Sequence, residues 1–325
     1  MMIQHDRRRF LSAAGMAASG LALSSGALGM VGNGLALAQG NKPKGFDISL
    51  AQWSLNRQFF AFLGRNNAAV DRKLDPQDFA SIAKNEFDIN GIEYVNQFYV
   101  EAVKQPGYLA DLKRKAADAG VTNVLIMCDG EGKLGDPDLK KRITAVRNHI
   151  KWLEWATELG CHSIRVNAAS SGSYDEQLKL AADGLRRLCE LGDTYGINVI
   201  VENHGGLSSH GRWLTTVMEM VDHPRCGTLP DFGNFYVERG DDPLEYDRYL
   251  GTWELMPWAK GVSAKSHAFD AEGNETSTDY ERIMKIVLKS GYHGWVGIEH
   301  EGAKDSFEGI RLTKALLERV REELV

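Results

Sequence analysis

The segment VIVENH (Val199–His204) is a short β-branched run that ends in an acid, an amide and an imidazole. A run this short and apolar is typical of a strand buried on both faces of a parallel sheet. Two later runs end in the same way, because GTLPD closes at Asp231 and WVGIE closes at Glu299. An isolated charge is strongly disfavoured at that depth, so the three matched carboxylates are expected to be paired or to bind a metal ion.

Similar runs recur about every 35 residues from Phe46 onward. The eight runs are Asp47–Gln52, Gly91–Val95, Thr122–Cys128, Ser163–Asn167, Asn198–Glu202, Gly227–Asp231, Gly261–Lys265 and Trp295–Glu299. Between them lie amphipathic segments with helical periodicity, including Leu139–Leu159, Tyr174–Tyr195 and Asp279–Lys289. Several of these segments are followed by glycines that suit helix ends, namely Gly120, Gly160, Gly196 and Gly291.

This alternation predicts a parallel sheet, and eight units in about 250 residues match a closed (β/α)8 barrel, the TIM barrel. The alternative is a doubly wound sheet with a dinucleotide site. No Gly-x-Gly-x-x-Gly motif opens a helix after the first run, which argues against that fold. The stretch Arg57–Lys73 lacks periodicity and is expected to form a loop over the barrel mouth.

Residues 1–38 resemble a twin-arginine export signal. Three arginines at positions 7–9 precede Phe10 and Leu11, and a small-residue cleavage pattern follows at Ala36–Ala38. The stretch between them is too rich in Gly and Ser for a stable membrane anchor. We therefore expect residues 1–38 to be read by the twin-arginine export machinery and residues 39–325 to form one catalytic barrel. The mature protein is then periplasmic or otherwise exported.

Charge and cysteine usage exclude several classes of protein. The formal net charge of −6, with Lys and Arg scattered among Asp and Glu, argues against a partner that is a nucleic acid. The four cysteines form no Cys-x-x-Cys pair, which argues against a thiolate zinc site; they are Cys128, Cys161, Cys189 and Cys226. Cys128 and Cys226 fall in apolar runs and are expected to be small core residues. The sequence leaves the disulfide state and a homo-oligomer open.

The active site of a barrel enzyme lies at the carboxyl ends of its strands. There the seventh run continues to His267, the nearest imidazole that could join Glu202, Asp231 and Glu299 around one divalent ion. Such an oxygen-rich site suits Mn²⁺, Mg²⁺ or Co²⁺, with Zn²⁺ left open. The strand ends also supply candidate substrate-binding residues, namely Trp53, Glu93, Arg165, Asn167, His204, Asn234 and Lys265.

Together these motifs resemble the xylose isomerase-like barrel superfamily, in its sugar phosphate isomerase/epimerase group. The resemblance runs from Phe46 to the C-terminus. It rests on Glu202-Asn203-His204, on Asp231 with Gly233, on the Lys265 region, and on Gly291-Tyr292-His293-Gly294 followed by Ile298-Glu299. Members of this family typically bind one divalent metal through Glu, Asp, His and Glu from the last four strands. The resemblance therefore implies Glu202, Asp231 and Glu299 as ligands.

Two positions depart from the family pattern. The family often has His two residues before the lysine that matches Lys265, and this chain has Ser263 there. The fourth ligand is then His267, water or Lys265. The family also often has a substrate-binding His three residues after the aspartate, where this chain has Asn234.

The resemblance implies proton transfer through a metal-bound enediolate, with Glu202 and Glu299 as the catalytic proton acceptor and donor. We expect an isomerase or epimerase of a non-phosphorylated sugar or sugar derivative, because phosphorylated sugars are chiefly cytoplasmic.

Other activities remain open. If a leaving group lies β to the same carbon, the same site eliminates it from an oxidised sugar or glycoside. The enzyme is then a lyase or dehydratase, with His204, Lys265 or Arg165 assisting the leaving oxygen. A non-catalytic exported sugar-binding barrel is a further alternative. A phosphodiesterase of the apurinic endonuclease type needs many His ligands, and the first three strand ends carry none.

Overall fold

The computed structural model describes residues 45–65, 70–303 and 305–325. The predicted export signal, residues 1–38, therefore lies outside the described residues. Among the helices that are described, none is long and apolar enough to cross a membrane.

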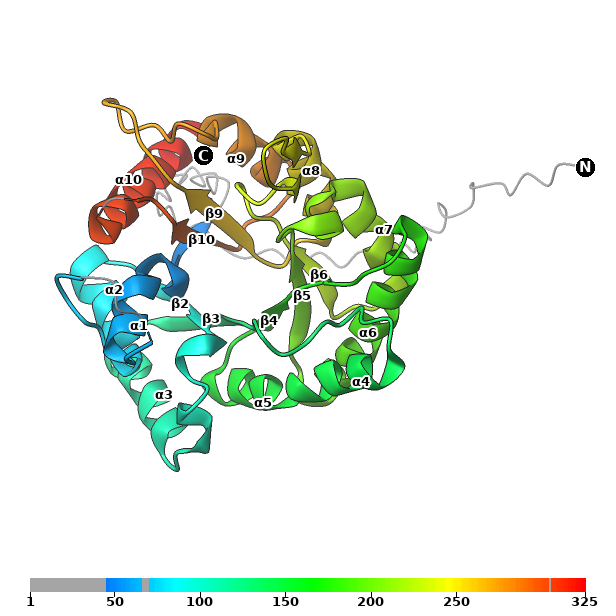
Figure 1. Ribbon diagram of the computed structural model, residues 1–325. Helices are drawn as coiled ribbons and strands as arrows, with labels where there is room; N and C mark the ends of the chain where they lie inside the picture. The colour runs from blue at the N-terminus through cyan, green and yellow to red at the C-terminus, as the bar shows by residue number, and fades with distance from the viewer. Residues whose placement is uncertain (1–44, 66–69, 304) are drawn as a thin grey trace, which may run out of the picture. The chain divides into compact units, whose positions relative to one another are not determined.

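Eight parallel strands form a ring at the centre of the molecule (Figure 1). They are β1 Asp47–Ala51, β2 Gly91–Val95, β3 Thr122–Met127, β4 Ser163–Val166, β5 Asn198–Glu202, β6 Cys226–Leu229, β9 Val262–Ser266 and β10 Trp295–His300. Their order in the sheet is β6-β5-β4-β3-β2-β1-β10-β9. Isolated parallel bridges, Thr228 to Ala259 and Asp231 to Ser263, connect the segments of β6 and β9. The predicted TIM barrel is confirmed, and each of the eight predicted runs overlaps a strand.

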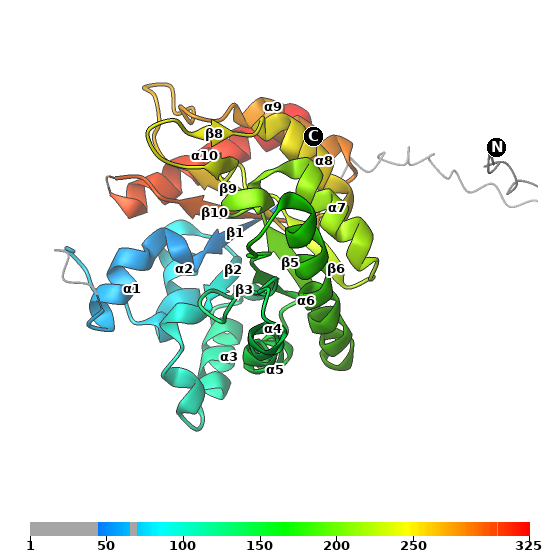
Figure 2. The same cartoon turned by 45° about the vertical axis from the view of Figure 1, so that its right-hand side comes forward.

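The helices surround the ring of strands (Figures 1 and 2). They are α1 Asn56–Phe62, α2 Phe79–Phe87, α3 Tyr108–Asp118, α4 Leu139–Asn148, α5 Ile150–Leu159, α6 Tyr174–Tyr195, α7 Gly211–Val221, α8 Arg248–Leu255, α9 Tyr280–Lys289 and α10 Ser306–Leu324. Short 3-10 turns span Gln52–Leu55, Pro76–Asp78, Asn96–Phe98, Ala102–Lys104, Gly206–Ser209 and Met256–Trp258. A small antiparallel hairpin, β7 Tyr236–Glu238 and β8 Leu244–Glu245, follows β6.

Helix ends follow the signals in the sequence. Helix α6 begins with a capping box, in which Ser173 bonds the backbone N–H of Glu176 and the Glu176 side chain bonds that of Ser173. It ends at Gly196, whose φ of 72° is the left-handed conformation that glycine adopts without a steric penalty. The predicted segment Tyr174–Tyr195 therefore matches α6 at both ends.

Two predicted segments differ from the structure. The stretch expected to be a loop, Arg57–Lys73, is helical over its first six residues, because Phe59 of α1 is buried against Phe79 and Phe98 at centroid distances of 5.8 and 5.2 Å. The segment Leu139–Leu159 is two helices, separated at His149. There the His149 ring forms a hydrogen bond with the carbonyl of residue 145 at 2.8 Å. The backbone N–H of His149 donates instead to the carbonyl of residue 146. A side chain that competes for the i−4 carbonyl interrupts a helix in this way.

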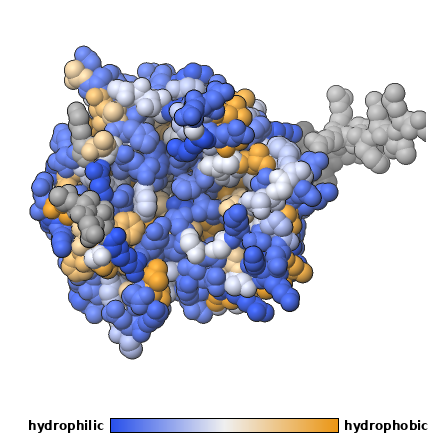
Figure 3. Space-filling model, viewed as in Figure 1, coloured by the Kyte–Doolittle hydropathy of each residue, from blue (hydrophilic) through white to orange (hydrophobic). Residues whose placement is uncertain are grey.

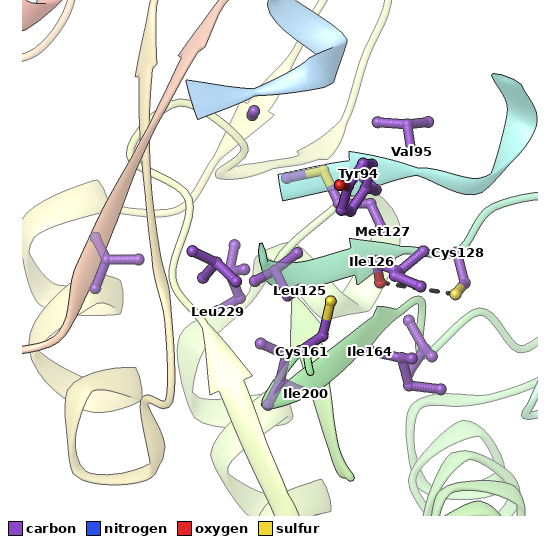
Figure 4. Close-up of a cluster of buried hydrophobic side chains, with 14 of the residues drawn as sticks. Tyr94, Val95, Leu125, Ile126, Met127, Cys128, Cys161, Ile164, Ile200 and Leu229 are labelled. Carbon is purple, nitrogen blue, oxygen red and sulfur yellow. Dashed lines mark hydrogen bonds between the residues drawn. The ribbon is translucent and has the colours of Figure 1, made fainter. Parts of the chain in front are cut away.

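Below the carboxyl ends of the strands the barrel interior is mainly apolar, apart from buried polar residues such as Ser49 and Glu93. Leu125, Ile200 and Leu229 converge there, and a Cβ on Gly261 would lie 3.3 to 3.7 Å from them. Figure 4 shows a cluster of buried hydrophobic side chains around β2 to β6, in which Cys128 and Cys161 pack among aliphatic side chains. All four cysteines are buried and free, so the expectation that Cys128 and Cys226 are core residues is confirmed. Apolar packing below leaves the polar groups gathered above.

Candidate metal and catalytic site

Three carboxylates meet at the carboxyl end of the barrel. Glu202 ends β5, Asp231 follows β6, and Glu299 lies in β10; their exposed fractions are 0%, 0% and 3%. One oxygen from each lies within 4.8 Å of the others. The register accounts for this, since Glu299 pairs with Lys265 of β9 and Asp231 forms a bridge with Ser263 of the same strand.

Asp231 is held by backbone donors that point one of its oxygens away from the site. Its Oδ1 accepts hydrogen bonds from the N–H groups of Gly233 at 2.8 Å and Asn234 at 2.9 Å. The Asn203 side chain bonds both the N–H and the C=O of Asp231. The Oδ2 atom is thereby left facing Ser263 and Lys265, at 2.8 and 3.7 Å from their polar atoms.

Glu202 lies between an amide and a guanidinium. Asn234 Nδ2 donates to its Oε1 at 3.0 Å, and Arg165 Nε lies 2.7 Å from its Oε2. The Arg165 contact is close enough for an ion pair but is not aligned as a hydrogen bond, which leaves Oε2 without an aligned donor among the described residues. Asp129 holds Arg165 from the other side at 2.8 Å and accepts from Asn167 at 2.6 Å. The predicted residues Arg165, Asn167 and Asn234 thus lie around the carboxylates.

Glu299 is paired with a buried lysine. Lys265 Nζ lies 2.7 Å from Glu299 Oε1 and 2.8 Å from Glu301 Oε2, and its side chain is 2% exposed. Burial alone would lower the pKa of Lys265, but Asp231, Glu299 and Glu301 outweigh burial and raise that pKa well above its usual value. Trp53 Nε1 donates to the second oxygen of Glu301. Lys265 is therefore a permanent cation, and Trp53 is fixed beside it.

Negative charge exceeds positive charge in this cluster. Among the described residues, five carboxylates face two cations; these are Asp129, Glu202, Asp231, Glu299 and Glu301 against Arg165 and Lys265. Burial raises the pKa of Glu202 to about 7 although Arg165 opposes it, and burial raises the pKa of Asp231 to about 7 although Lys265 opposes it. Buried, hard oxygen donors with excess negative charge fit a divalent cation such as Mg²⁺ or Mn²⁺.

A divalent ion is expected to bind this site more weakly as the pH falls below about 7. Protons must leave Glu202 and Asp231 before their oxygens can bind a cation, so each displaced proton costs roughly tenfold in affinity per pH unit. Calorimetric titration with MnCl2 from about pH 5.5 to about 8, in buffers of different ionisation enthalpy, measures the affinity and the protons released. An affinity that stays constant without proton release would contradict this prediction.

The two candidate histidines lie at the mouth. His267 follows β9 and its side chain is exposed. Its ring nitrogens are not among the potential ligand atoms that lie within 4.8 Å of one another, which come from Glu202, Asp231 and Glu299. His204 follows Glu202, and its backbone N–H bonds Ser208 Oγ at 3.1 Å. Desolvation by the surrounding protein lowers the pKa of His204, and the positive charge of Arg165 lowers it further. His267 as a metal ligand stays a prediction.

Glu93 lies inside the barrel. It is 1% exposed, its Oε1 accepts from Ser49 Oγ at 2.6 Å, and its buried Oε2 has no hydrogen-bond partner among the described residues. A Cβ on Gly297 would lie 2.4 Å from Glu93 Oε1, so the glycine leaves the space that this carboxyl fills. The structure encloses Glu93 and does not bring it to the mouth with the other predicted substrate-binding residues.

Replacing Glu93 by Gln is expected to stabilise the protein increasingly as the pH rises from 4.5 to about 8. Burial raises the pKa of Glu93 from 4.5 to about 8, so the folded state keeps a proton that the unfolded chain loses. The stability contribution of this group therefore falls across that window, by up to about 1.4 kcal/mol per pH unit. Urea unfolding of both proteins across the window measures the difference, and Glu322→Gln, at an exposed position of α10, is the control. A difference that does not change with pH would contradict the prediction.

Three contacts of the site are not evident from the sequence patterns. Ser263 Oγ lies between Asp231 Oδ2 and Glu299 Oε2, at 2.8 and 2.9 Å. Glu301 lies two residues beyond Glu299, which is the strand spacing that returns a side chain to the same face. Arg239, on the loop between β7 and β8, donates to Asn234 Oδ1 at 3.4 Å, and no motif marks it. The face seen down the barrel is largely hydrophilic (Figure 3).

A model of the xylose isomerase-like TIM barrel family matches residues 82–322 of the chain. The chain belongs to this family. The family resemblance seen in the sequence is therefore confirmed, and the carboxylates at the strand ends occupy the carboxyl-terminal face where barrel enzymes of all kinds carry their chemistry.

Part of this chain is also similar in sequence to a dehydratase. Inosose dehydratase of Clostridium beijerinckii is 26% identical over 147 residues, which are 39% of this chain and 48% of that protein. This match spans about half the length of that relative.

Solved structures of several proteins share the fold. The 3-keto-D-glucoside 4-epimerase of E. coli has a TM-score of 0.59 and 16% identity, covering 84% of this chain and 99% of that one. A xylose isomerase-like TIM barrel protein from Mycobacterium smegmatis, in complex with magnesium, has a TM-score of 0.61 and 16% identity, covering 86% and 98%. At this identity the likeness shows the fold alone.

Proposed function

We propose that this protein is a divalent-metal-dependent enzyme that moves a proton at a sugar carbon beside a carbonyl, as an isomerase or epimerase of a non-phosphorylated sugar or sugar derivative. The observation that carries the proposal is the convergence of three buried carboxylates from separate strand ends within 4.8 Å. The similarity of the fold to a 3-keto-D-glucoside 4-epimerase supports the substrate class.

The proposed metal ligands are Glu202, Asp231 and Glu299, whose hard oxygens and excess charge suit Mg²⁺ or Mn²⁺. When bound, such an ion supplies Lewis acidity that makes the hydrogen beside a substrate carbonyl easier to remove. The similarity to a structure in complex with magnesium supports this choice of cation.

Glu202 and Glu299 are the proposed proton acceptor and donor. They project from β5 and β10, which β6 and β9 separate in the ring, so a sugar between them offers a different side to each. Asn234 and Arg165 fix the carboxylate of Glu202, and Lys265 fixes that of Glu299. A carboxylate held in one orientation takes a proton without first reorganising its surroundings.

The two buried cations have a second proposed task. Negative charge builds up on the substrate oxygen when the neighbouring carbon loses its proton. Arg165 and Lys265 are preorganised positive charges, 3% and 2% exposed, and buried charges of this kind stabilise a developing anion most strongly. Trp53, Asn167 and His204 lie around the mouth and are proposed to bind the substrate.

A lyase or dehydratase acting on an oxidised sugar is the second candidate function. The match to inosose dehydratase over 147 residues favours it. The first step is the same proton removal by a carboxylate. A hydroxyl on the next carbon then departs with a proton supplied by His204, while the positive charge of Lys265 stabilises the departing oxygen, and a double bond is left in the product.

We also propose that the protein is exported by the twin-arginine route, because the arginines at positions 7–9 and the small residues at 36–38 fit such a signal. That route carries folded proteins, so a metal could bind before export.

Proton exchange with deuterated water tests the function. The protein is loaded with MnCl2 and incubated in deuterated water with a panel of free sugars and 3-oxidised glycosides, and products are followed by NMR. Deuterium at a carbon beside the carbonyl supports the isomerase or epimerase, and loss of water or of an aglycone supports the lyase. Sugar binding with neither exchange nor elimination on any member of the panel would leave a non-catalytic binding barrel.

A further inference from the structure

Ser263 lies between two of the three carboxylates, Asp231 and Glu299. It is fully buried in β9, and its Oγ is 2.8 Å from Asp231 Oδ2 and 2.9 Å from Glu299 Oε2. A serine hydroxyl has one proton, so it can donate to only one of these two oxygens. When both carboxylates are deprotonated, as metal binding requires, the other contact sets oxygen lone pairs against each other. A cation among these oxygens would remove that repulsion.

The backbone fixes Ser263 in this position. Its N–H bonds the carbonyl of Pro230 at 2.9 Å and its carbonyl accepts from Phe232 at 3.0 Å, so it is tied to the residues on both sides of Asp231. On its other side it pairs with Gly297 in the ladder between β9 and β10. The hydroxyl therefore cannot move far from the two carboxylates while the barrel is closed.

The other candidates for a fourth ligand fit less well. His267 lies beyond the end of β9 with an exposed side chain, and its backbone N–H is bonded by the buried carboxylate of Glu275 at 3.2 Å. Lys265 is held as an ammonium by three carboxylates, and an ammonium has donors but no lone pair to offer a metal.

We propose that Ser263 supplies the neutral fourth ligand, which completes an all-oxygen site with Glu202, Asp231 and Glu299. This inference rests on the metal site of the proposed function and deepens it. Imidazole nitrogen favours Zn²⁺, Co²⁺ and other late transition metals, whereas an all-oxygen set of carboxylates and a hydroxyl suits Mg²⁺ and Mn²⁺. The proposed site therefore favours hard cations, whereas the family pattern that the sequence resembles often has His at this position.

Calorimetric titration of the metal-stripped protein with MgCl2, MnCl2 and ZnSO4 tests the proposal. Ser263→Ala is expected to weaken Mn²⁺ binding by about tenfold, because one ligand is lost. Ser263→Cys keeps the size of the side chain but replaces oxygen by sulfur, so the ratio of Zn²⁺ to Mg²⁺ affinity is expected to rise by at least about tenfold. His267→Ala tests the competing ligand, and its affinities are expected to lie within about twofold of the parent. Circular dichroism and thermal melts confirm that each variant is folded.

Two results would overturn the assignment. One is a Mn²⁺ affinity that Ser263→Ala leaves unchanged, which would give the fourth position to water. The other is a loss of binding in His267→Ala, which would give it to the imidazole. These readouts need no turnover. If the protein binds metal as expected but shows no chemistry on any sugar, the proposed function is wrong and Ser263 remains a ligand. If turnover depends on metal but Ser263→Ala leaves the metal affinities unchanged, only the assignment of Ser263 is wrong.

Discussion

Replacing Glu299 by Gln is expected to lower kcat by roughly 10³-fold to 10⁴-fold on any sugar that shows proton exchange. The amide has nearly the shape of the carboxylate, but it cannot accept a proton at neutral pH. It also carries no charge to hold a cation or to pair with Lys265, which lies 2.7 Å away. The rate of deuterium incorporation at the substrate carbon, measured with saturating metal, gives the effect.

Glu202→Gln is the companion experiment, because the proposal gives both acids to one reaction. Groups that act as a unit lose most of their effect with the first substitution, so the double variant is expected to be little slower than either single variant. Glu322→Gln, on the exposed side of α10, is the control for loss of one carboxylate. If Glu299→Gln retains more than about a tenth of the parent rate with metal bound, Glu299 is not a proton-transfer group.

Replacing Lys265 by Met is expected to destabilise the metal-free protein by about 3–5 kcal/mol. The lysine is 2% exposed and is the cation shared by Asp231, Glu299 and Glu301. Without it the buried carboxylates of Asp231 and Glu299 lose their partner and must be protonated or repel one another. Urea unfolding followed by circular dichroism measures the free energy of unfolding. Saturating MnCl2 is expected to restore part of the loss, since an ion that binds only the folded state stabilises it.

Lys113→Met is the matched control for this prediction. Lys113 forms an ion pair with Glu158 at 3.0 Å, but both side chains are more than half exposed. Exposed pairs of this kind contribute about 0–1 kcal/mol, so this variant is expected to unfold nearly as the parent does. Equal losses in the two lysine variants would show that Lys265 does not neutralise the buried carboxylates.

Much of the barrel could be predicted because its signals are local. Each strand is a short apolar run, and the acids that end three of these runs share an edge of the sheet once the strands are parallel. Glu202, Asp231 and Glu299 could thus be grouped without coordinates. The ends of α6 were equally clear, because the capping box at Ser173 and the glycine at 196 act over a few residues.

The remaining contacts depend on register and packing between distant segments. Trp53 reaches Glu301 across 248 positions of the chain, and no sequence pattern records that distance. The side chain of Glu93 is enclosed because Gly297 on another strand leaves room for it. The break at His149 depends on a ring rotamer that bonds the carbonyl of residue 145, which periodicity alone does not reveal.

The segments of β6 and β9 meet through isolated bridges, whereas every other neighbouring pair in the ring forms a ladder among the described strands. Asp231 lies on the β6 side of this contact and Ser263 lies on the β9 side. A metal ion bound by residues on both sides would stabilise the closed barrel at the place where the two segments are joined only by isolated bridges. Metal binding would then complete the active site and stabilise the closed barrel at the same time.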